Sequence, residues 1–183
     1  MPEVDDGFAA LWDAYYDDVL GYAARRVDQE TARDVAAETF LVAWRRRDEV
    51  PADRPFPWLL HVTRNVLANE ARGHRRRGRL WGRMRDDREL SAPVADVALG
   101  LAEGGRIHAA LGRLSPRDRE ALQLVGWEEL DPKDAAVVAG CSAKTFSVRL
   151  HRARRRLSAV LAELDADDHR LPAAPTLQRS PQS

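Results

Sequence analysis

The sequence has 183 residues but a single cysteine and five histidines. The single thiol, Cys141, excludes an internal disulfide and a cysteine-rich metal site, and it is expected to be a small turn residue. No glycine-rich phosphate loop and no nucleophile elbow is present. The sequence therefore predicts no cofactor, no metal site and no catalytic residue, and its many acids are expected to be solvated. The histidines, which show no metal-ligand spacing, are His61, His74, His108, His151 and His169.

Long apolar runs are also missing from the chain. Nowhere do 18 apolar residues follow one another, so no segment is expected to insert into a membrane. The first six residues, Met1–Asp6, are acidic and lack the basic and apolar parts of a signal peptide. These absences predict a cytoplasmic protein.

Acidic and basic residues balance over the whole chain, yet they are segregated along it. The 29 basic and 29 acidic residues give a formal net charge of zero. Residues 61–88 carry nine bases against three acids, while residues 89–105 carry three acids and no base. A second basic zone, residues 142–157, holds six lysine or arginine residues and no acid. Two basic zones on either side of an acidic linker predict two nucleic-acid contacts held at a distance.

The second basic zone belongs to a stretch, Asp131–Leu157, whose pattern is helix, tight turn, helix. Asp131 and the proline after it are typical of a helix start, and Gly140 allows the left-handed backbone of the turn. Ser142 is expected to cap the last helix, in which Phe146 begins an inward-facing apolar stripe. The second helix of such a motif is the element that enters a DNA major groove.

Apolar residues at spacings of three and four predict three amphipathic helices in the N-terminal part. The first spans about residues 7–26, and the second spans about residues 31–47 with Thr31 as its N-cap. The segment 48–57 holds three prolines and is expected to be a loop, after which Pro57 opens a third helix that ends near His74.

No strand pattern is present, so the predicted fold class is all-α, with two small helical domains joined by a flexible linker. The first domain is expected over residues 7–77 and the linker over 78–105, with a short helical piece at 96–103. The second domain, residues 106–164, contains the helix-turn-helix. The tail, residues 165–183, is expected to be disordered because it is rich in proline and poor in apolar residues.

Four segments of this sequence resemble bacterial sigma-70-type transcription initiation factors. The segment 34–46 resembles the second conserved region of that family, and Pro57–Asn65 resembles the helix that follows it. Leu114–Leu122 and Val148–Arg154 resemble the fourth region. Their order, their spacing and the short linker are similar to those of the compact extracytoplasmic-function (ECF) group, over about residues 7–163.

The resemblance implies a sigma factor that directs core RNA polymerase to promoters and recognises their −35 and −10 elements. It implies that the second helix docks on the clamp of the largest polymerase subunit, while the surface around Leu122 and Trp127 meets the flap. An anti-sigma factor is a further expected partner. The residues implied at the polymerase contact are Asp34, Glu38, Thr39, Phe40, Trp44 and Arg45.

The −10 element is assigned by the same resemblance to the loop 48–56 and the helix after it. In this family the loop captures a base flipped out of the DNA stack, because the base-pairing edge of a stacked base cannot be read. Asn65 and Asn69 are the side chains most suited to base edges. An acid in the family commonly stands one position before Glu70, which leaves the residue-level assignment open. The arginines suited to phosphates are Arg64, Arg72, Arg75 and Arg76.

The −35 element is assigned to the N-terminal turns of the last helix, whose side chains reach base edges in a helix-turn-helix. Lys144 or Arg149 is suited to guanine or to a phosphate. The residues implied at this contact are Ala143, Lys144, Thr145, Ser147, Val148, Arg149 and Arg152.

The residues alone leave three alternatives open. The helix-turn-helix alone fits a DNA-binding transcriptional regulator that does not bind polymerase. The whole pattern also fits an interaction protein, such as a decoy that binds a regulator without initiating transcription. At a finer level, the aromatic side chains of Phe40 and Trp44 fit a place in the core as well as a place on a partner-binding surface.

Overall fold

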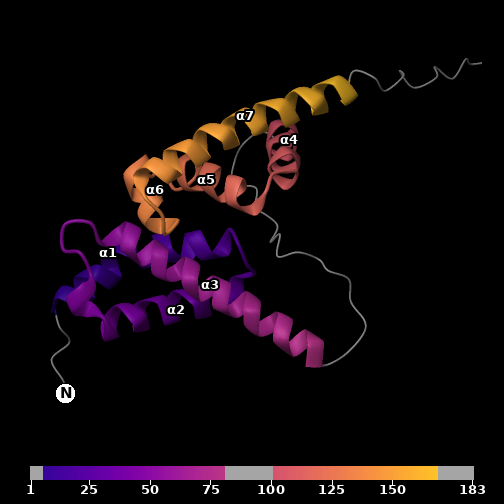
Figure 1. Cartoon of the computed structure of the whole chain (residues 1–183). Helices are drawn as coiled ribbons and strands as arrows, with labels where there is room; N and C mark the ends of the chain where they lie inside the picture. Colours follow the sequence, from indigo (N-terminus) through magenta and orange to yellow (C-terminus); the bar gives the residue numbers. More distant parts are fainter. Residues whose placement is uncertain (1–5, 81–100, 169–183) are drawn as a thin grey trace, which may run out of the picture.

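The computed structural model describes the backbone of residues 6–80 and 101–168, and the side chains of residues 6–73 and 105–166. Within these residues every regular element is helical, which confirms the all-α fold class. Figure 1 shows the N-terminal helices lying below the C-terminal helices. The elements are α1 (Asp6–Ala24), α2 (Gln29–Arg45), the short 3-10 helix η1 (Arg47–Glu49), α3 (Pro55–Leu80), α4 (Leu101–Gly112), α5 (Pro116–Gly126), α6 (Pro132–Val138) and α7 (Ala143–Asp168).

The N-cap of α2 is Asp28, so the prediction that Thr31 caps this helix is wrong. The Asp28 side chain accepts a hydrogen bond from the Thr31 backbone amide at 3.0 Å and another from the Thr31 hydroxyl at 2.8 Å. These bonds favour the charged carboxylate and lower the pKa of Asp28. Aspartate is as strong a cap as threonine, and it stands one residue before the helix begins.

The caps of the C-terminal helices are as predicted. The Ser115 hydroxyl accepts from the Asp118 amide, and Asp131 accepts from two amides in the first turn of α6. Ser142 Oγ accepts from the Thr145 amide at 3.1 Å and opens α7. Gly140 has φ of 64°, a left-handed conformation that turns the chain sharply between α6 and α7. The helix-turn-helix therefore forms where the sequence predicts it.

Several helix boundaries differ from the prediction. Helix α2 begins at Gln29, and α3 begins at Pro55, inside the predicted loop, and not at Pro57. Helix α3 continues to Leu80, and α4 already begins at Leu101, inside the predicted linker. Helix α7 continues to Asp168, so residues 165–168 are not disordered as predicted. Half-buried leucines extend the apolar stripe of α7 beyond Leu157, and Arg106 of α4 pairs with Asp165, which keeps the last turns ordered.

An aromatic cluster holds α1 against α2. The ring of Phe40 lies 4.7 Å from that of Trp12 and 5.9 Å from that of Tyr16, measured between centroids. Phe8 packs edge-on against both Phe40 and Trp44. Edge-on and tilted pairs of this kind add to the hydrophobic free energy of burial.

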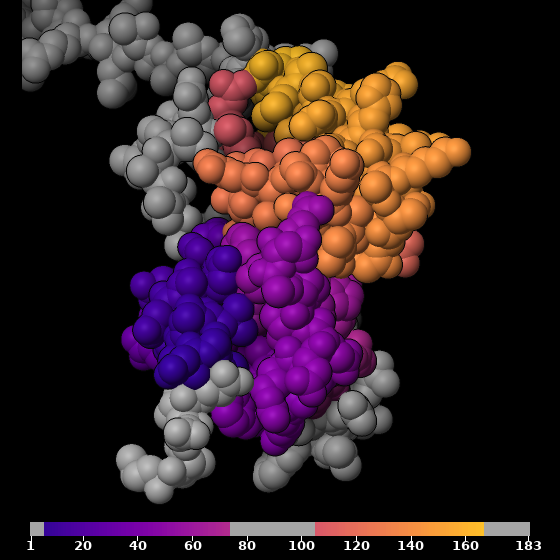
Figure 2. All heavy atoms as spheres, turned by 90° about the vertical axis from the view of Figure 1, so that its left-hand side faces the viewer, coloured from indigo at the N-terminus to yellow at the C-terminus, as the bar shows by residue number. Residues whose placement is uncertain are grey.

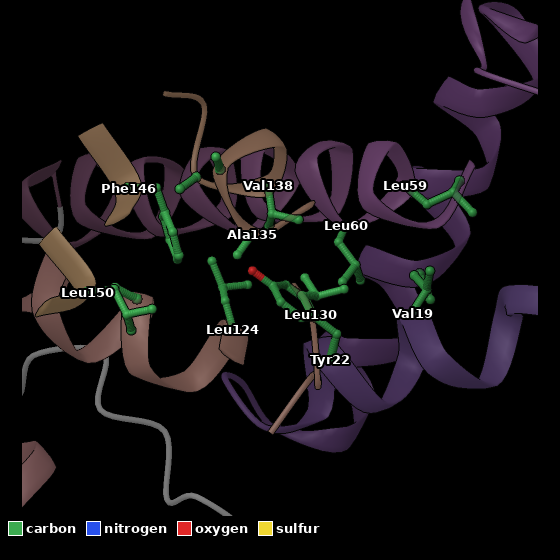
Figure 3. Packing of buried hydrophobic residues seen from close by; sticks show 14 of the residues in the cluster. Val19, Tyr22, Leu59, Leu60, Leu124, Leu130, Ala135, Val138, Phe146 and Leu150 are labelled. Atoms are coloured by element: carbon green, nitrogen blue, oxygen red, sulfur yellow. The ribbon is translucent and has the colours of Figure 1, made fainter. Parts of the chain in front are cut away.

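The two halves of the molecule share one hydrophobic core. Figure 3 shows Tyr22 of α1 and Leu60 of α3 beside Leu130, Leu124 and Val138 of the C-terminal half. All five side chains are buried. The space-filling view shows the two halves in direct contact (Figure 2). The predicted domains are therefore packed against each other in the free chain.

Tyr22 makes the stability of this core depend on pH. Burial raises the pKa of Tyr22 to about 12, because the phenolate would lose its hydration, and the Tyr22 hydroxyl makes no hydrogen bond to a described protein group. The Tyr22 hydroxyl ionises near pH 10 in the unfolded chain, but it stays protonated at that pH in the folded chain. The free energy of unfolding should therefore fall between pH 10 and pH 12, by about 1.4 kcal/mol for each unit by which the two pKa values differ.

Tyr22→Phe should remove the fall in the free energy of unfolding that Tyr22 causes between pH 10 and pH 12. The free energy of unfolding at pH 7 should be unchanged or higher, since no hydrogen bond is lost. Urea unfolding of both proteins from pH 8 to pH 12 measures the difference. Parallel pH profiles of the two proteins would show that Tyr22 ionises as readily in the folded state as in the unfolded state.

Candidate polymerase and nucleic-acid interfaces

Helix α2 lies on the side of the molecule away from the C-terminal half (Figure 1), and several of its charged and aromatic residues are exposed. Asp34, Glu38 and Arg45 are exposed, and Trp44 and Leu41 keep 37% and 41% of their surface in contact with solvent. Two large apolar side chains between charges on one exposed helix face are typical of a surface that binds a protein partner.

The two other residues predicted at this contact are buried, and this part of the prediction is corrected. Thr39 is fully buried; its hydroxyl donates to the Val35 carbonyl at 2.8 Å and lies 3.3 Å from the Thr63 hydroxyl. Phe40 is 1% exposed, inside the aromatic cluster. Neither side chain reaches a partner in this structure, so both act by fixing α2 on α1 and α3.

Three of the predicted −10 residues, Asn65, Asn69 and Arg72, recur at helical spacing along one side of α3. Asn65 and Asn69 are exposed; the Asn65 amide lies 3.1 Å from His61 Nε2, and Asn69 accepts a hydrogen bond from Arg72. The amide groups of the two asparagines and the guanidinium of Arg72 can donate hydrogen bonds to base edges and to phosphates. Arg75 and Arg76 belong to the same helix, and their side chains lie outside the described residues.

Arg64, the remaining residue of this group, is not available to a phosphate here. Its guanidinium pairs with Glu120 of α5, with Nη2 3.3 Å from Oε2. The carboxylate stabilises the charged guanidinium and raises the pKa of Arg64. In this conformation Arg64 connects the two halves of the chain.

The predicted −35 residues share the outer face of α7. Ala143, Lys144 and Thr145 form its exposed first turn, while Phe146, 0% exposed, anchors the opposite face. The exposed residues that follow are Ser147, Val148 and Arg152, and Arg149 is half-buried. Val148 keeps 46% of its surface in solvent, and such an apolar side chain on a DNA-reading face can contact a thymine methyl group.

Glu128 is a buried acid that the sequence prediction missed. Its side chain is 3% exposed, against the expectation that the acids are solvated. Its carboxylate pairs with Arg25, which stands just after α1, and its Oε1 lies 3.2 Å from Nη1 of Arg26. Glu128 and its neighbour Glu129 look alike in the sequence. Only the packing of the two halves distinguishes them, because it buries the Glu128 side chain and leaves Glu129 exposed.

Neither a metal site nor a membrane span emerges from the described residues. No group of three or more histidine, cysteine or acidic side chains among them could hold an ion. No helix in the described parts of the chain is long and apolar enough to cross a bilayer.

Comparison with known proteins identifies the family. The sequence model of Sigma-70 region 2 matches residues 11–77, and that of Sigma-70, region 4 matches residues 104–157. The RNA polymerase sigma factor CnrH of Cupriavidus metallidurans is 34% identical over 163 residues, covering 82% of this chain and 83% of that protein. The chain belongs to the sigma-70 family, in its ECF group.

Other relatives agree with this assignment. The ECF sigma factor EcfG of Rhodopseudomonas palustris is 33% identical over 76% of each chain. The structure of CnrH in complex with the cytosolic domain of CnrY superposes with a TM-score of 0.59 at 28% identity, covering 90% of this chain and 92% of the other. The sigma factor RpoE of Bartonella quintana, solved with the anti-sigma factor NepR, has the same fold, with a TM-score of 0.62 at 24% identity over 85% and 97% of the chains.

The chain is therefore an RNA polymerase sigma factor, which directs core polymerase to promoters by recognising −35 and −10 elements. Sigma factors are DNA-recognition subunits without an enzymatic reaction of their own. The alternative of a helix-turn-helix regulator that works without polymerase is disfavoured, because the region 2 match covers the N-terminal half. The helices α1 to α3 correspond to region 2, and α4 to α7 correspond to region 4.

Proposed function

We propose that this ECF sigma factor works through three separate faces: α2 for core polymerase, α3 for the −10 element and the start of α7 for the −35 element. The observation that carries this proposal is the two-sided character of α7. Phe146, Leu150 and Ala153 are buried on one side, and the predicted reading residues lie on the other. A helix anchored in this way can enter a major groove without disturbing the core behind it.

At the −35 element, Lys144 and Arg149 are proposed to contact guanine or phosphate, and Val148 to contact a thymine methyl group. Arg152, one turn further along α7, is proposed to hold the DNA backbone. At the −10 element, Asn65 and Asn69 are proposed to read bases, and Arg72 to bind a phosphate. Arg64, Arg75 and Arg76 are proposed as further phosphate contacts, Arg64 after its pair with Glu120 has opened.

The proposed polymerase contact consists of Asp34, Glu38, Trp44 and Arg45. Trp44→Ala should weaken binding to core polymerase by about tenfold or more, because a half-exposed tryptophan on a helix face is the kind of side chain that dominates protein interfaces. Fluorescence anisotropy of the labelled sigma factor, titrated with core polymerase, measures the affinity.

Leu161→Ala serves as the control for this substitution, because it removes a half-buried apolar side chain on α7, which packs against α4, α5 and α6 and belongs to no predicted polymerase contact. The loss of affinity should be several-fold larger for Trp44→Ala than for Leu161→Ala. Equal affinities of the Trp44→Ala protein and the unchanged protein would remove α2 from the proposed interface.

The remaining proposals concern partners and location. The relative CnrH was solved with the cytosolic domain of CnrY, and we extend this to the present chain by proposing an anti-sigma factor as a partner. Because polymerase and promoters are in the cytoplasm, this chain is proposed to act there. It is proposed to need no cofactor and to catalyse no reaction.

A further inference from the structure

A cleft of about 630 Å³ is formed where the end of α1 and one face of α3 approach α4 and α5. In Figure 1, α4 and α5 lie above α3. Clefts that bind small molecules in proteins have volumes of about 300–1,000 Å³. The cleft is therefore large enough for a ligand of several functional groups, and its walls show which chemistry it suits.

The walls of this cleft carry far more positive than negative charge. Among the lining residues that the structure describes, Glu120 is the only acid. Glu128, which is not part of the lining, pairs with two of the arginines from outside. Like charges that are crowded into one cleft repel each other, and a bound anion would relieve this repulsion. The lining arginines are Arg25, Arg26, Arg64, Arg72, Arg117 and Arg119.

Two of these guanidinium groups are held in place by the protein. Arg119 donates to the carbonyl oxygens of Leu111 and Gly112, at 2.9 Å and 3.0 Å, where α4 ends. Arg64 pairs with Glu120 across the cleft. Donors that are already ordered lose little entropy when a ligand binds. Arg119 also places a positive charge at the C-terminal end of α4, whose own dipole would otherwise repel an anion.

Two other arginines face the cleft without a carboxylate partner. Arg72 and Arg117 are exposed, and neither forms an ion pair within the described part of the chain. Arg72 lies on α3 and Arg117 lies in the first turn of α5, so they approach the cleft from opposite walls. A guanidinium presents its N–H donors in a planar fork that fits two oxygens of a phosphate group. The cleft can therefore hold phosphate groups from both sides.

Between the arginines, the walls of the cleft are largely apolar. The apolar residues that line it include Val27, Leu67, Ala68, Ala71 and Leu111. An inorganic phosphate ion would use the guanidinium groups and leave this apolar surface in contact with water. A ligand that joins several phosphates to an apolar or aromatic ring would use both parts of the lining.

We propose that this cleft is a binding site for a small organic polyphosphate, with the size and charge of a nucleoside triphosphate. The arginines bind its phosphates from both walls, and its ring lies against the apolar residues of α3 and α4. Arg64, Asn65 and Arg72 belong both to this lining and to the proposed −10 contact, so the bound ligand competes with −10 DNA. This competition, unlike the binding itself, rests on the proposed function of α3.

The binding is tested by isothermal titration calorimetry of the full-length chain with ATP. The titration is done without magnesium, so that the phosphates keep their charge, and at about 0.15 M salt, which screens weak surface attraction. One ATP should bind per chain in a saturable manner. Inorganic triphosphate should bind several-fold more weakly, and adenosine should not bind measurably.

Two pairs of variants show whether ATP binds in the cleft. Ala71→Glu places a carboxylate in the lining and should weaken ATP binding by about tenfold or more, whereas Ala71→Gln, of the same size but uncharged, should have a much smaller effect. Arg72→Ala combined with Arg117→Ala should also cost about tenfold or more. The same charge is removed outside the cleft by Arg33→Ala combined with Arg113→Ala, and this should change little. Circular dichroism checks that each variant is folded.

The competition is tested by titrating the chain with a short single-stranded DNA. Saturating ATP should lower the DNA affinity several-fold. DNA binding that is unaffected by bound ATP would overturn the competition. Because the ATP titration needs neither polymerase nor a promoter, a chain that binds ATP in the cleft but fails to direct transcription would count against the proposed function and not against this site.

Several results would overturn the site itself. The first is the absence of saturable ATP binding. Equal effects of Ala71→Glu and Ala71→Gln, or of the two double variants, would mean that ATP responds to the net charge of the chain and not to the cleft. Triphosphate that binds as tightly as ATP would overturn the assignment of an organic ligand. DNA binding that Ala71→Glu abolishes, in a chain that does not bind ATP, would assign the cleft to nucleic acid.

Discussion

Phe40→Ala should lower the free energy of unfolding by about 3–5 kcal/mol, the cost typical of removing a large aromatic side chain from a well-packed core. Phe40 is 1% exposed and touches three other aromatic rings, from Phe8, Trp12 and Tyr16, so its removal leaves a cavity that α1 and α2 cannot easily close. Urea denaturation followed by far-ultraviolet circular dichroism measures this loss.

The neighbouring Trp44→Ala provides the control, because Trp44 keeps 37% of its surface in solvent and borders the same cluster. Trp44→Ala should lower the free energy of unfolding clearly less than Phe40→Ala does. It should weaken binding to core polymerase more than Phe40→Ala does, when only folded Phe40→Ala protein is compared. A Phe40→Ala protein as stable as the unchanged chain but unable to bind core polymerase would restore Phe40 to the interface and contradict the structure.

Lys144→Ala combined with Arg149→Ala should reduce affinity for the −35 element by about 30-fold or more, since each good contact to a base is worth about 1–3 kcal/mol. Lys144 is exposed and Arg149 half-buried on the outer face of α7, away from the residues that hold the helix in place. Binding of polymerase reconstituted with this variant to promoter DNA is measured at several salt concentrations. The salt dependence shows whether the two side chains neutralise phosphates, because each phosphate that is no longer neutralised makes the dependence less steep.

Arg113→Ala combined with Arg117→Ala is the matched control, because it removes the same charge from exposed positions outside α7. The control should retain most of the promoter affinity, and both double variants should bind core polymerase normally. Equal loss of polymerase binding and DNA binding in the α7 variant would mean that these residues stabilise the domain and do not read DNA.

The local structure follows from the sequence, and the contact between the halves does not. Proline after Ser115 and Asp131, glycine at position 140 and the apolar spacing of α7 are short-range signals, and the structure has the predicted helices at each of them. The boundary error at Asp168 arose because half-buried leucines and an ion pair extend α7 beyond its strongest periodicity.

Roles that depend on long-range packing could not be predicted in this way. Phe40 and Trp44 are aromatic residues one helical turn apart, and only the position of α1 decides that the first is core and the second is surface. Glu128 was expected to be solvated because nothing within its own segment indicates the two arginines about one hundred residues earlier. The sequence shows which residues can contact DNA or polymerase, and the packing decides which of them are free to do so.

The most direct test is reconstitution of the purified chain with sigma-free core polymerase on a library of genomic fragments, followed by mapping of transcript starts. A sigma factor that works through α3 and α7 should give starts that share a −35 and −10 pair at fixed spacing, and the Lys144→Ala, Arg149→Ala protein should lose them. Binding of the chain alone to duplex DNA, without association with core polymerase and without initiated transcripts, would contradict the account.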